Sequence, residues 1–178
     1  AWSATPDPAS DRYNLWAFRV DWTDPGSATL VGPTTLTAPE FDANLCEFDR
    51  NCIPQPAGGN RLDTLSLMSM YRLSYRNFAD HEAMVINHTT DVGDDRAGVR
   101  WSESRNPNST PELFQTGTFA PEDGLNRWMG AASIDGRGGI AIGYSVSSAD
   151  TFPGLRYAAR LEGEPLGELS QGEAVIVD

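Results

Sequence analysis

Residues 126–144 read Asn126-Arg-Trp-Met-Gly-Ala-Ala-Ser-Ile-Asp-Gly-Arg-Gly-Gly-Ile-Ala-Ile-Gly-Tyr144, and after a polar loop residues 154–161 read Gly154-Leu-Arg-Tyr-Ala-Ala-Arg-Leu161. The turn Asp135-Gly-Arg-Gly-Gly139 suits a tight reversal, because glycine accepts positive φ at little cost. The segments around it are short and rich in apolar residues. The pattern predicts strand, turn, strand, loop and strand, which is an antiparallel meander.

The same pattern occurs 56 residues earlier, from Met70 to Arg105, without a gap. The aligned segments are Met84-Val-Ile86 with Ile140-Ala-Ile142, Gly98-Val-Arg-Trp101 with Gly154-Leu-Arg-Tyr157, and Phe78 with Ile134. A period near 50 made of short strands is typical of propeller blades and comparable β arrays, in which one unit packs against its copy. The alternative is a coincidence between two hairpins of one β-sandwich.

The repeat predicts an all-β chain of antiparallel four-stranded, propeller-type blades, with two full units and part of a third, in an incomplete propeller. We expect one partial β-propeller domain over residues 1–178. It consists of an arm (1–11), a partial blade (12–32), a Pro-rich cysteine loop (33–61) and two blades (62–119 and 126–178). Strands are expected near residues 70–76, 83–89, 99–103, 113–119, 129–134, 140–146, 155–161 and 174–177.

The partial blade begins with an alternation. From Asn14 onward Trp16, Phe18, Val20 and Trp22 alternate with smaller or polar residues, which predicts a strand with four large apolar side chains on one face. A turn follows at Asp24-Pro-Gly26, and residues 29–31 are expected to pair back. An incomplete propeller exposes a sheet edge at each end. The candidate edge or interface residues are Trp16, Trp22, Val175 and Val177.

Composition excludes several partners. The formal charge of -12 and the pI near 4.4 oppose binding to nucleic acid or to an anionic lipid surface. No window of 18 consecutive apolar residues occurs, so we expect no membrane span. An acidic surface can attract Ca²⁺, but no Asp-x-Asp-x-Asp-Gly loop occurs, and we predict neither a metal site nor a cofactor.

The two cysteines, Cys46 and Cys52, lie in one turn-rich loop. Two thiols without a nearby His pair are too few for structural zinc, so a local disulfide is favoured over free thiols. A disulfide implies an oxidising compartment. The chain begins at Ala1 without an apolar signal region, which indicates a mature form after signal removal or a piece of something longer. We therefore expect an extracytoplasmic protein, either secreted or periplasmic.

The densest polar cluster is Asp80-His81-Glu82. These residue types can ligate a metal or exchange protons. Adjacent residues on a turn point in different directions, however, which favours a polar turn. No Ser/His/Asp order, phosphate loop, HExxH or CxxC pattern occurs, and we predict no catalytic residue.

Several segments of the chain together resemble one family. These segments are Leu15-Trp-Ala-Phe-Arg-Val-Asp-Trp22, Cys52-Ile-Pro-Gln-Pro56, Met70-Tyr-Arg-Leu-Ser-Tyr-Arg-Asn-Phe78-Ala-Asp-His-Glu82, Asn126-Arg-Trp-Met129 and Ile140-Ala-Ile-Gly-Tyr-Ser-Val-Ser-Ser148. With them the chain resembles, over nearly its whole length, the later portion of large secreted bacterial β-propeller proteins, mostly uncharacterised and loosely related to sialidase-like, BNR-repeat propellers. Such proteins are longer than this chain, so the resemblance implies blades before and after it.

The resemblance to sialidases does not identify an active site in this sequence. The segment from Ser133 to Gly138 approximates the Asp-box of that family, but it shifts the glycine and lacks the aromatic residue, and the box is structural there. Sialidase chemistry needs arginines for the substrate carboxylate and a tyrosine nucleophile paired with glutamate. The residues of suitable type are Tyr71, Arg72, Arg76, Glu82, Arg100, Arg127 and Arg156, and their spacing matches no such motif.

Two classes of function follow. The first is a noncatalytic extracytoplasmic β-sheet module, a structural or binding element of a larger protein or multi-subunit assembly. Its partner is another protein chain or the remainder of the same polypeptide. The missing blades, the Pro-rich loop and the lack of a catalytic motif favour this class. The alternative is a fragment of a sialidase-like, glycan-processing propeller enzyme, which rests on likeness of fold alone.

Overall fold

The computed structural model describes residues 11–178, so all of the expected arm except Asp11 lies outside the described residues. The described chain forms three antiparallel sheets, one of two strands and two of four strands. The only helical segments in this part are short 3-10 turns at Pro25–Ser27, Cys46–Phe48 and Pro56–Gly58. The prediction of an all-β chain is confirmed.

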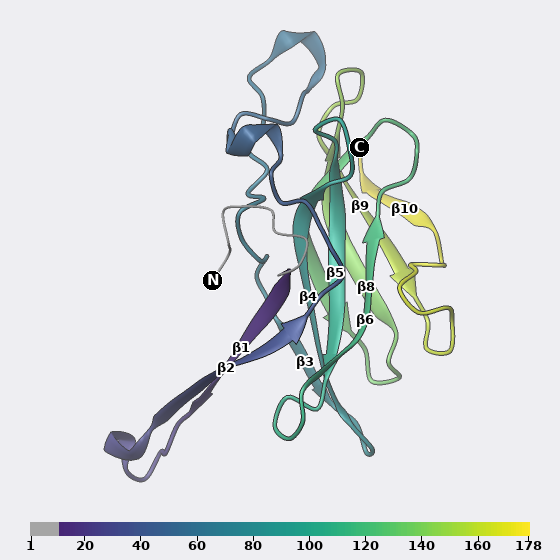
Figure 1. Cartoon of the computed structure of the whole chain (residues 1–178). Helices are drawn as coiled ribbons and strands as arrows, with labels where there is room; N and C mark the ends of the chain where they lie inside the picture. The colour runs from purple at the N-terminus through teal and green to yellow at the C-terminus, as the bar shows by residue number, and fades with distance from the viewer. Residues whose placement is uncertain (1–10) are drawn as a thin grey trace.

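The two four-stranded sheets pack face to face, and they overlap in the view of Figure 1. The first sheet has the order β3-β4-β5-β6 and the second the order β10-β9-β8-β7, so both are simple meanders. The strands of the first sheet are β3 (Ser74–Asn77), β4 (Glu82–Asp91), β5 (Ala97–Arg105) and β6 (Glu112–Phe119). Those of the second sheet are β7 (Asn126–Ile134), β8 (Ile140–Ser147), β9 (Gly154–Arg160) and β10 (Glu173–Val177).

The 56-residue register is confirmed in the central strands. Met84 pairs with Ser104 across β4 and β5, and Ile140 pairs with Arg160 across β8 and β9. Every pair between β8 and β9 is a pair between β4 and β5 moved by this interval. The outer strands do not keep it. Tyr75 pairs with Met84, whereas the equivalent Ala131 pairs with Gly143, and β7 also shifts register between Trp128 and Ala131. A β-bulge there adds a residue to one strand and offsets the pairing beyond it.

The main core lies between the two four-stranded sheets. Val85 and Trp101 of the first sheet pack in one cluster with Ile140 and Ile142 of the second, and all four are almost fully buried. At Gly130 the backbone of the second sheet lies against the side chain of Asn87 in the first, where a Cβ atom would collide with it. Contact between two apolar sheet faces is the usual way in which such sheets bury their surface.

The two four-stranded sheets are stacked with the same orientation, so equivalent side chains point in the same direction. We call the face with Met84 and Ile86, or with Ile140 and Ile142, the Ile face. The Ile face of the second sheet packs on the first sheet, whereas that of the first sheet points toward the two-stranded sheet. Accordingly Trp101 is buried in the core, but its equivalent Tyr157 is 42% exposed.

The two-stranded sheet pairs β1 (Arg12–Arg19) with β2 (Thr29–Thr37) and extends away from the main body at the lower left of Figure 1. The expectation of four apolar residues on one strand face was wrong. The strand ends at Arg19, before Val20 and Trp22, and its register shifts between Leu15 and Ala17. Pro33 lacks a donor for the ladder, and a bulge at this level accommodates it. Because β2 reaches Thr37 and β3 begins at Ser74, the irregular connection covers residues 38–73 and not the predicted range 33–61.

The cysteine loop contains the expected disulfide between Cys46 and Cys52. Cys52, Leu45 and Ile53 pack with Ala97 and Trp128 in a second buried cluster. The bridge therefore fixes the loop against one end of both four-stranded sheets. Among residues 11–178, none of the helical segments has the length and apolar character needed to cross a bilayer.

Candidate binding cleft and buried polar networks

A cleft of about 850 Å³ lies between β1 and the Ile face of the first sheet. Met84, Ile86 and Leu113 form part of its floor, and every residue of β1 lines its wall. Side chains of a strand alternate between its two sides. Residues of both faces of β1 line the cleft, so its unpaired edge lies beside that space, and Val31, Thr34 and Leu36 of β2 also line it.

The lining of the cleft is mixed. Its aromatic residues are Tyr13, Trp16, Phe18, Phe41, Phe48 and Tyr75. Its uncharged polar residues include Asn14, Ser69, Ser102, Ser104, Asn108 and Ser109. Its charged residues are Asp11, Arg12 and Arg19. A mainly apolar concavity with few charged groups is the usual form of a ligand or peptide site.

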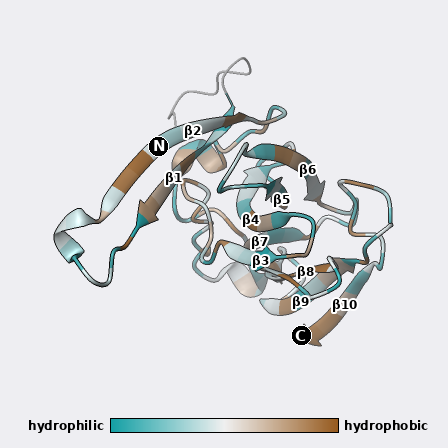
Figure 2. Ribbon diagram, turned by 90° about the horizontal axis from the view of Figure 1, so that it is seen from below, coloured by the Kyte–Doolittle hydropathy of each residue, from teal (hydrophilic) through white to brown (hydrophobic). Residues whose placement is uncertain are grey.

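Beyond the cleft, the hairpin exposes large apolar side chains to solvent. We call residues 16–31 the hairpin arm. Trp16 is 56% exposed, Phe18 67%, Trp22 88%, Leu30 63% and Val31 59%. Figure 2 shows hydrophobic stretches on both strands. An isolated two-stranded hairpin is marginal in water, and a contiguous apolar patch on a soluble protein marks an interaction site.

A polar network anchors the base of the hairpin. The Tyr13 hydroxyl lies 3.2 Å from Nε2 of His88 and accepts a hydrogen bond of 2.9 Å from Ser102 Oγ. The other ring nitrogen, Nδ1 of His88, lies 3.2 Å from the Thr89 carbonyl oxygen. Burial lowers the pKa of His88 to about 4, and the charge of Arg100 contributes in the same direction. At neutral pH the ring is therefore uncharged, with Nδ1–H donating to Thr89 and Nε2 accepting from Tyr13.

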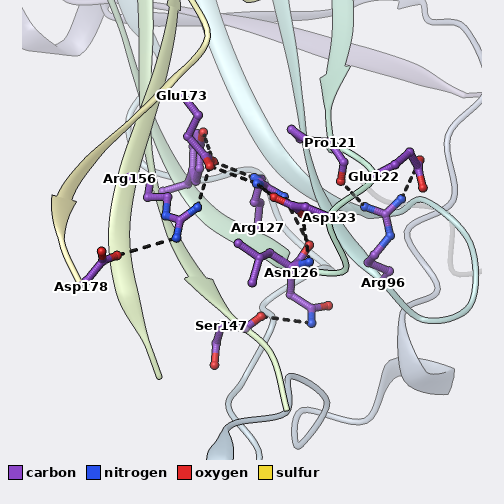
Figure 3. A network of polar contacts seen from close by, with 12 residues as sticks. Arg96, Pro121, Glu122, Asp123, Asn126, Arg127, Ser147, Arg156, Glu173 and Asp178 are labelled. Carbon is purple, nitrogen blue, oxygen red and sulfur yellow. Dashed lines mark hydrogen bonds and ion pairs between the residues drawn. The ribbon is translucent and has the colours of Figure 1, made fainter. Parts of the chain in front are cut away.

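A second network surrounds Arg127 (Figure 3), whose side chain is fully buried. Arg127 Nη2 donates to Asp123 Oδ2 at 2.6 Å, and Arg127 Nε donates to Glu173 Oε1 at 2.7 Å. Glu173 also accepts from the Tyr144 hydroxyl at 2.8 Å and from Arg156 Nη1 at 2.8 Å. The hydrogen bond from Arg127 lowers the pKa of Asp123 to about 2. Burial and the adjacent Glu173 raise the pKa of the Tyr144 phenol.

This network unites the residue types that sialidase chemistry needs. The sequence indicated Arg127 and Arg156 but missed Tyr144 and Glu173. The 56-residue register contained a signal, because Tyr144 and Arg156 are the equivalents of His88 and Arg100. Tyr144 is only 2% exposed and its hydroxyl is bonded to Glu173. In this geometry the phenol braces the second sheet and is not presented to a substrate.

The remaining sialidase-type residues do not converge. Tyr71 is almost fully exposed. Arg76 donates from Nε to the Ile134 carbonyl oxygen at 3.1 Å, and Arg100 donates to Thr118 Oγ1 at 3.1 Å. Arg72 is exposed, like Tyr71. These side chains hold strands together or face solvent, so they form no common site.

The cluster Asp80-His81-Glu82 is divided between separate partners. The Asp80 carboxylate lies 2.8 Å from His81 Nδ1, and the His81 ring stacks on Phe78 with centroids 4.7 Å apart. Glu82 instead accepts from the Tyr75 hydroxyl at 2.5 Å and from Asn108 Nδ2 at 2.8 Å. Within residues 11–178, no group of three or more His, Cys, Asp or Glu side chains is arranged to hold a metal ion.

The candidate edge residues lie on exposed strands or turns. Trp16 lies in β1 and Trp22 follows that strand, whereas Val175 and Val177 lie in β10 at the edge of the second sheet. All four side chains are more than half exposed. Comparisons with protein-family models, with curated proteins and with solved structures gave no match to this chain.

Proposed function

We propose that this chain is a noncatalytic extracytoplasmic β-sheet module, which acts as a structural or binding element of a larger protein or multi-subunit assembly. The hairpin arm carries the proposal. It presents Phe18, Trp22 and Leu30 to solvent, and each of these side chains is more than 60% exposed. Burying such side chains against a partner stabilises a complex by roughly 1.5–3 kcal/mol for each one that is fully covered.

Charge and redox chemistry support the nature of the partner and the compartment. The chain carries a net charge of -12, which favours a neutral or basic protein surface over nucleic acid or an anionic membrane. The Cys46–Cys52 disulfide favours an oxidising compartment. The common direction of the two Ile faces supports an array of stacked sheets in the manner of successive propeller blades.

The alternative, a fragment of a glycan-processing propeller enzyme, is favoured by one observation. Tyr144, Glu173 and the two arginines Arg127 and Arg156 contact one another. Against it stands the burial of the phenol, which leaves no room for a sugar ring beside the reacting oxygen. Turnover of a fluorogenic sialoside by the native protein, and its loss in Tyr144→Phe, would favour the enzyme.

Sedimentation velocity of the disulfide-bonded chain tests the proposal. We expect self-association that increases with protein concentration, because the exposed arm buries apolar surface in any contact it makes. Phe18→Ser should reduce the association. The matched control is Phe152→Ser, because Phe18 and Phe152 are both 67% exposed and Phe152 lies in a loop of the second unit. A monodisperse, cooperatively folding monomer that hydrolyses the sialoside would falsify the proposal.

A further inference from the structure

The two-stranded sheet has an unpaired edge at β1, at a position where each of the other two sheets has further strands. Both of those sheets contain four strands, whereas among the strands of residues 11–178 β1 pairs with β2 alone. Side chains from both faces of β1 line the cleft, which places its other edge beside that space, and Val31, Thr34 and Leu36 of β2 line it from the face of the hairpin. Backbone N–H and C=O groups on such an edge are unpaired, and they form a template for an added strand.

We propose that the free edge of β1 binds an extended segment of a partner protein, which pairs with β1 as a third strand and fills the cleft. This inference rests on the proposed function and specifies how the module recognises its partner. Strand addition supplies affinity through main-chain hydrogen bonds and specificity through pockets for alternate side chains.

The size of the cleft fits a single strand. β1 contains eight residues, which at about 3.3 Å per residue give an edge about 26 Å long. The cleft of about 850 Å³ extends along all of these residues. One set of alternate side chains of the added strand then faces Met84, Ile86 and Leu113. We therefore expect apolar residues at every second position of the bound segment.

Charge specifies the ends of the bound segment. Arg12 and Arg19 stand at the two ends of β1, both are exposed, and neither β1 nor β2 contains a carboxylate. At the Arg12 end, the Asp11 carboxylate accepts a hydrogen bond of 2.8 Å from the Phe41 backbone N–H. Opposite charges across paired strands are favourable and like charges are not. The best occupant is thus an apolar strand with an acidic residue at each end, carried by a partner whose remaining surface is neutral or basic.

The same charges oppose a second copy of this chain as the occupant. In an antiparallel pair of two β1 strands, Arg12 of one copy lies near Arg19 of the other, so like charges meet at both ends. The net charge of -12 on each copy adds repulsion between the bodies. A separate partner strand with acidic ends avoids both costs.

Selection from a random peptide display library on the full, disulfide-bonded chain tests the inference. We expect enrichment of peptides with alternating apolar residues and acidic ends. A synthetic peptide of the selected sequence should slow hydrogen exchange of β1 amides. Ile86→Asp should weaken its binding by about tenfold or more, since a carboxylate on the cleft floor opposes an apolar side chain. The matched control Leu155→Asp, on the exposed face of the second sheet, should not weaken it.

A variant that leaves the floor intact keeps the test decisive if Ile86→Asp fails to fold. Arg12→Glu with Arg19→Glu changes only exposed side chains and should shift the selected peptides to basic ends. Absence of enrichment over an unrelated protein, or protection of β3 or β10 in place of β1, overturns the inference. If the chain self-associates through the arm but selects no peptide, the inference fails and the proposed function stands.

Discussion

The Ile faces of the two four-stranded sheets have the same pattern and different surroundings. Ile140 and Ile142 are fully buried because the first sheet covers them. Met84 and Ile86 occupy the equivalent positions and line a cleft under the hairpin, where Met84 is buried and Ile86 is partly exposed. The same strand pattern thus forms a core under a four-stranded sheet and lines a cleft under a two-stranded one.

The polar pairs on these faces differ in the same way. His88 opposite Arg100 is the equivalent of Tyr144 opposite Arg156. In the second sheet Tyr144 and Arg156 both bond to Glu173, which belongs to the same sheet. In the first sheet His88 bonds to Tyr13, which belongs to the hairpin. The first sheet thus uses this position to hold a separate layer.

The largest difference in stability is expected for substitutions on the faces of the two sheets that point away from the Ile faces. Trp101→Ala should lower the free energy of unfolding by about 3–5 kcal/mol, because it removes a fully buried side chain from the main core. Tyr157→Ala, at the equivalent position, should cost less than about 1 kcal/mol because Tyr157 is half exposed. Urea unfolding of both variants measures the difference. Equal costs would mean that the exposed face of the second sheet is covered in solution.

The second prediction concerns pH. The pKa of His88 is about 4 in the folded chain and about 6.5 in an unfolded one, so the unfolded state binds more protons between these values. Stability should therefore fall by about 3 kcal/mol as pH decreases from about 6.5 to about 4. His88→Gln should remove this component. The measurement is the difference in unfolding free energy between parent and variant across that range, and a constant difference contradicts the burial of a neutral ring.

Tyr13→Phe should loosen the hairpin more than the body. Loss of the hydrogen bond to His88 costs about 1 kcal/mol, and its effect should be concentrated in faster hydrogen exchange of β1 and β2. Tyr144→Phe is the counterpart in the second sheet and should accelerate exchange in β8 and β9. Uniform acceleration over the whole chain in Tyr13→Phe would show that the hairpin and the body unfold as one unit.

The smallest expected difference is between two conservative substitutions. Ile142→Val removes one methyl group from the core and should cost about 1 kcal/mol. Ile86→Val removes the same group beside the cleft, where fewer atoms pack against it, and should cost less than about 0.5 kcal/mol. Thermal unfolding of the two variants distinguishes them. If Ile86→Val costs as much, the cleft is closed in the free protein.

Much of this fold was predictable, because strand pattern is local and repeats. The alternation around Ile140 and Ile142 located β8, and the 56-residue shift then located β4 and β5 with their pairing. The disulfide was predictable because Cys46 and Cys52 lie in one short loop. These features depend on residues that are close in the sequence or on the 56-residue repeat, and both can be read directly from the sequence.

The site was less predictable, because it depends on contacts between distant residues and on departures from the pattern. Tyr13 meets His88 across 75 positions of the chain, and no motif marks that contact. The bulge opposite Pro33 ended the expected alternation at Trp16. The cleft exists because the two-stranded sheet covers only part of a four-stranded sheet. The sequence pattern locates individual strands but does not predict which sheets pack against each other.

The exposed hairpin arm also sets the colloidal behaviour of the protein. At neutral pH the net charge of -12 weakens the association of molecules through their hairpin arms and keeps the resulting assemblies dispersed. Near the pI of about 4.4 that repulsion vanishes while Trp22 and Phe18 remain in solvent. Precipitation should therefore set in around this pH, and added salt should bring it closer to neutrality by screening the charge. Because of the exposed hairpin arm, the protein should be stored well above its pI and at low ionic strength.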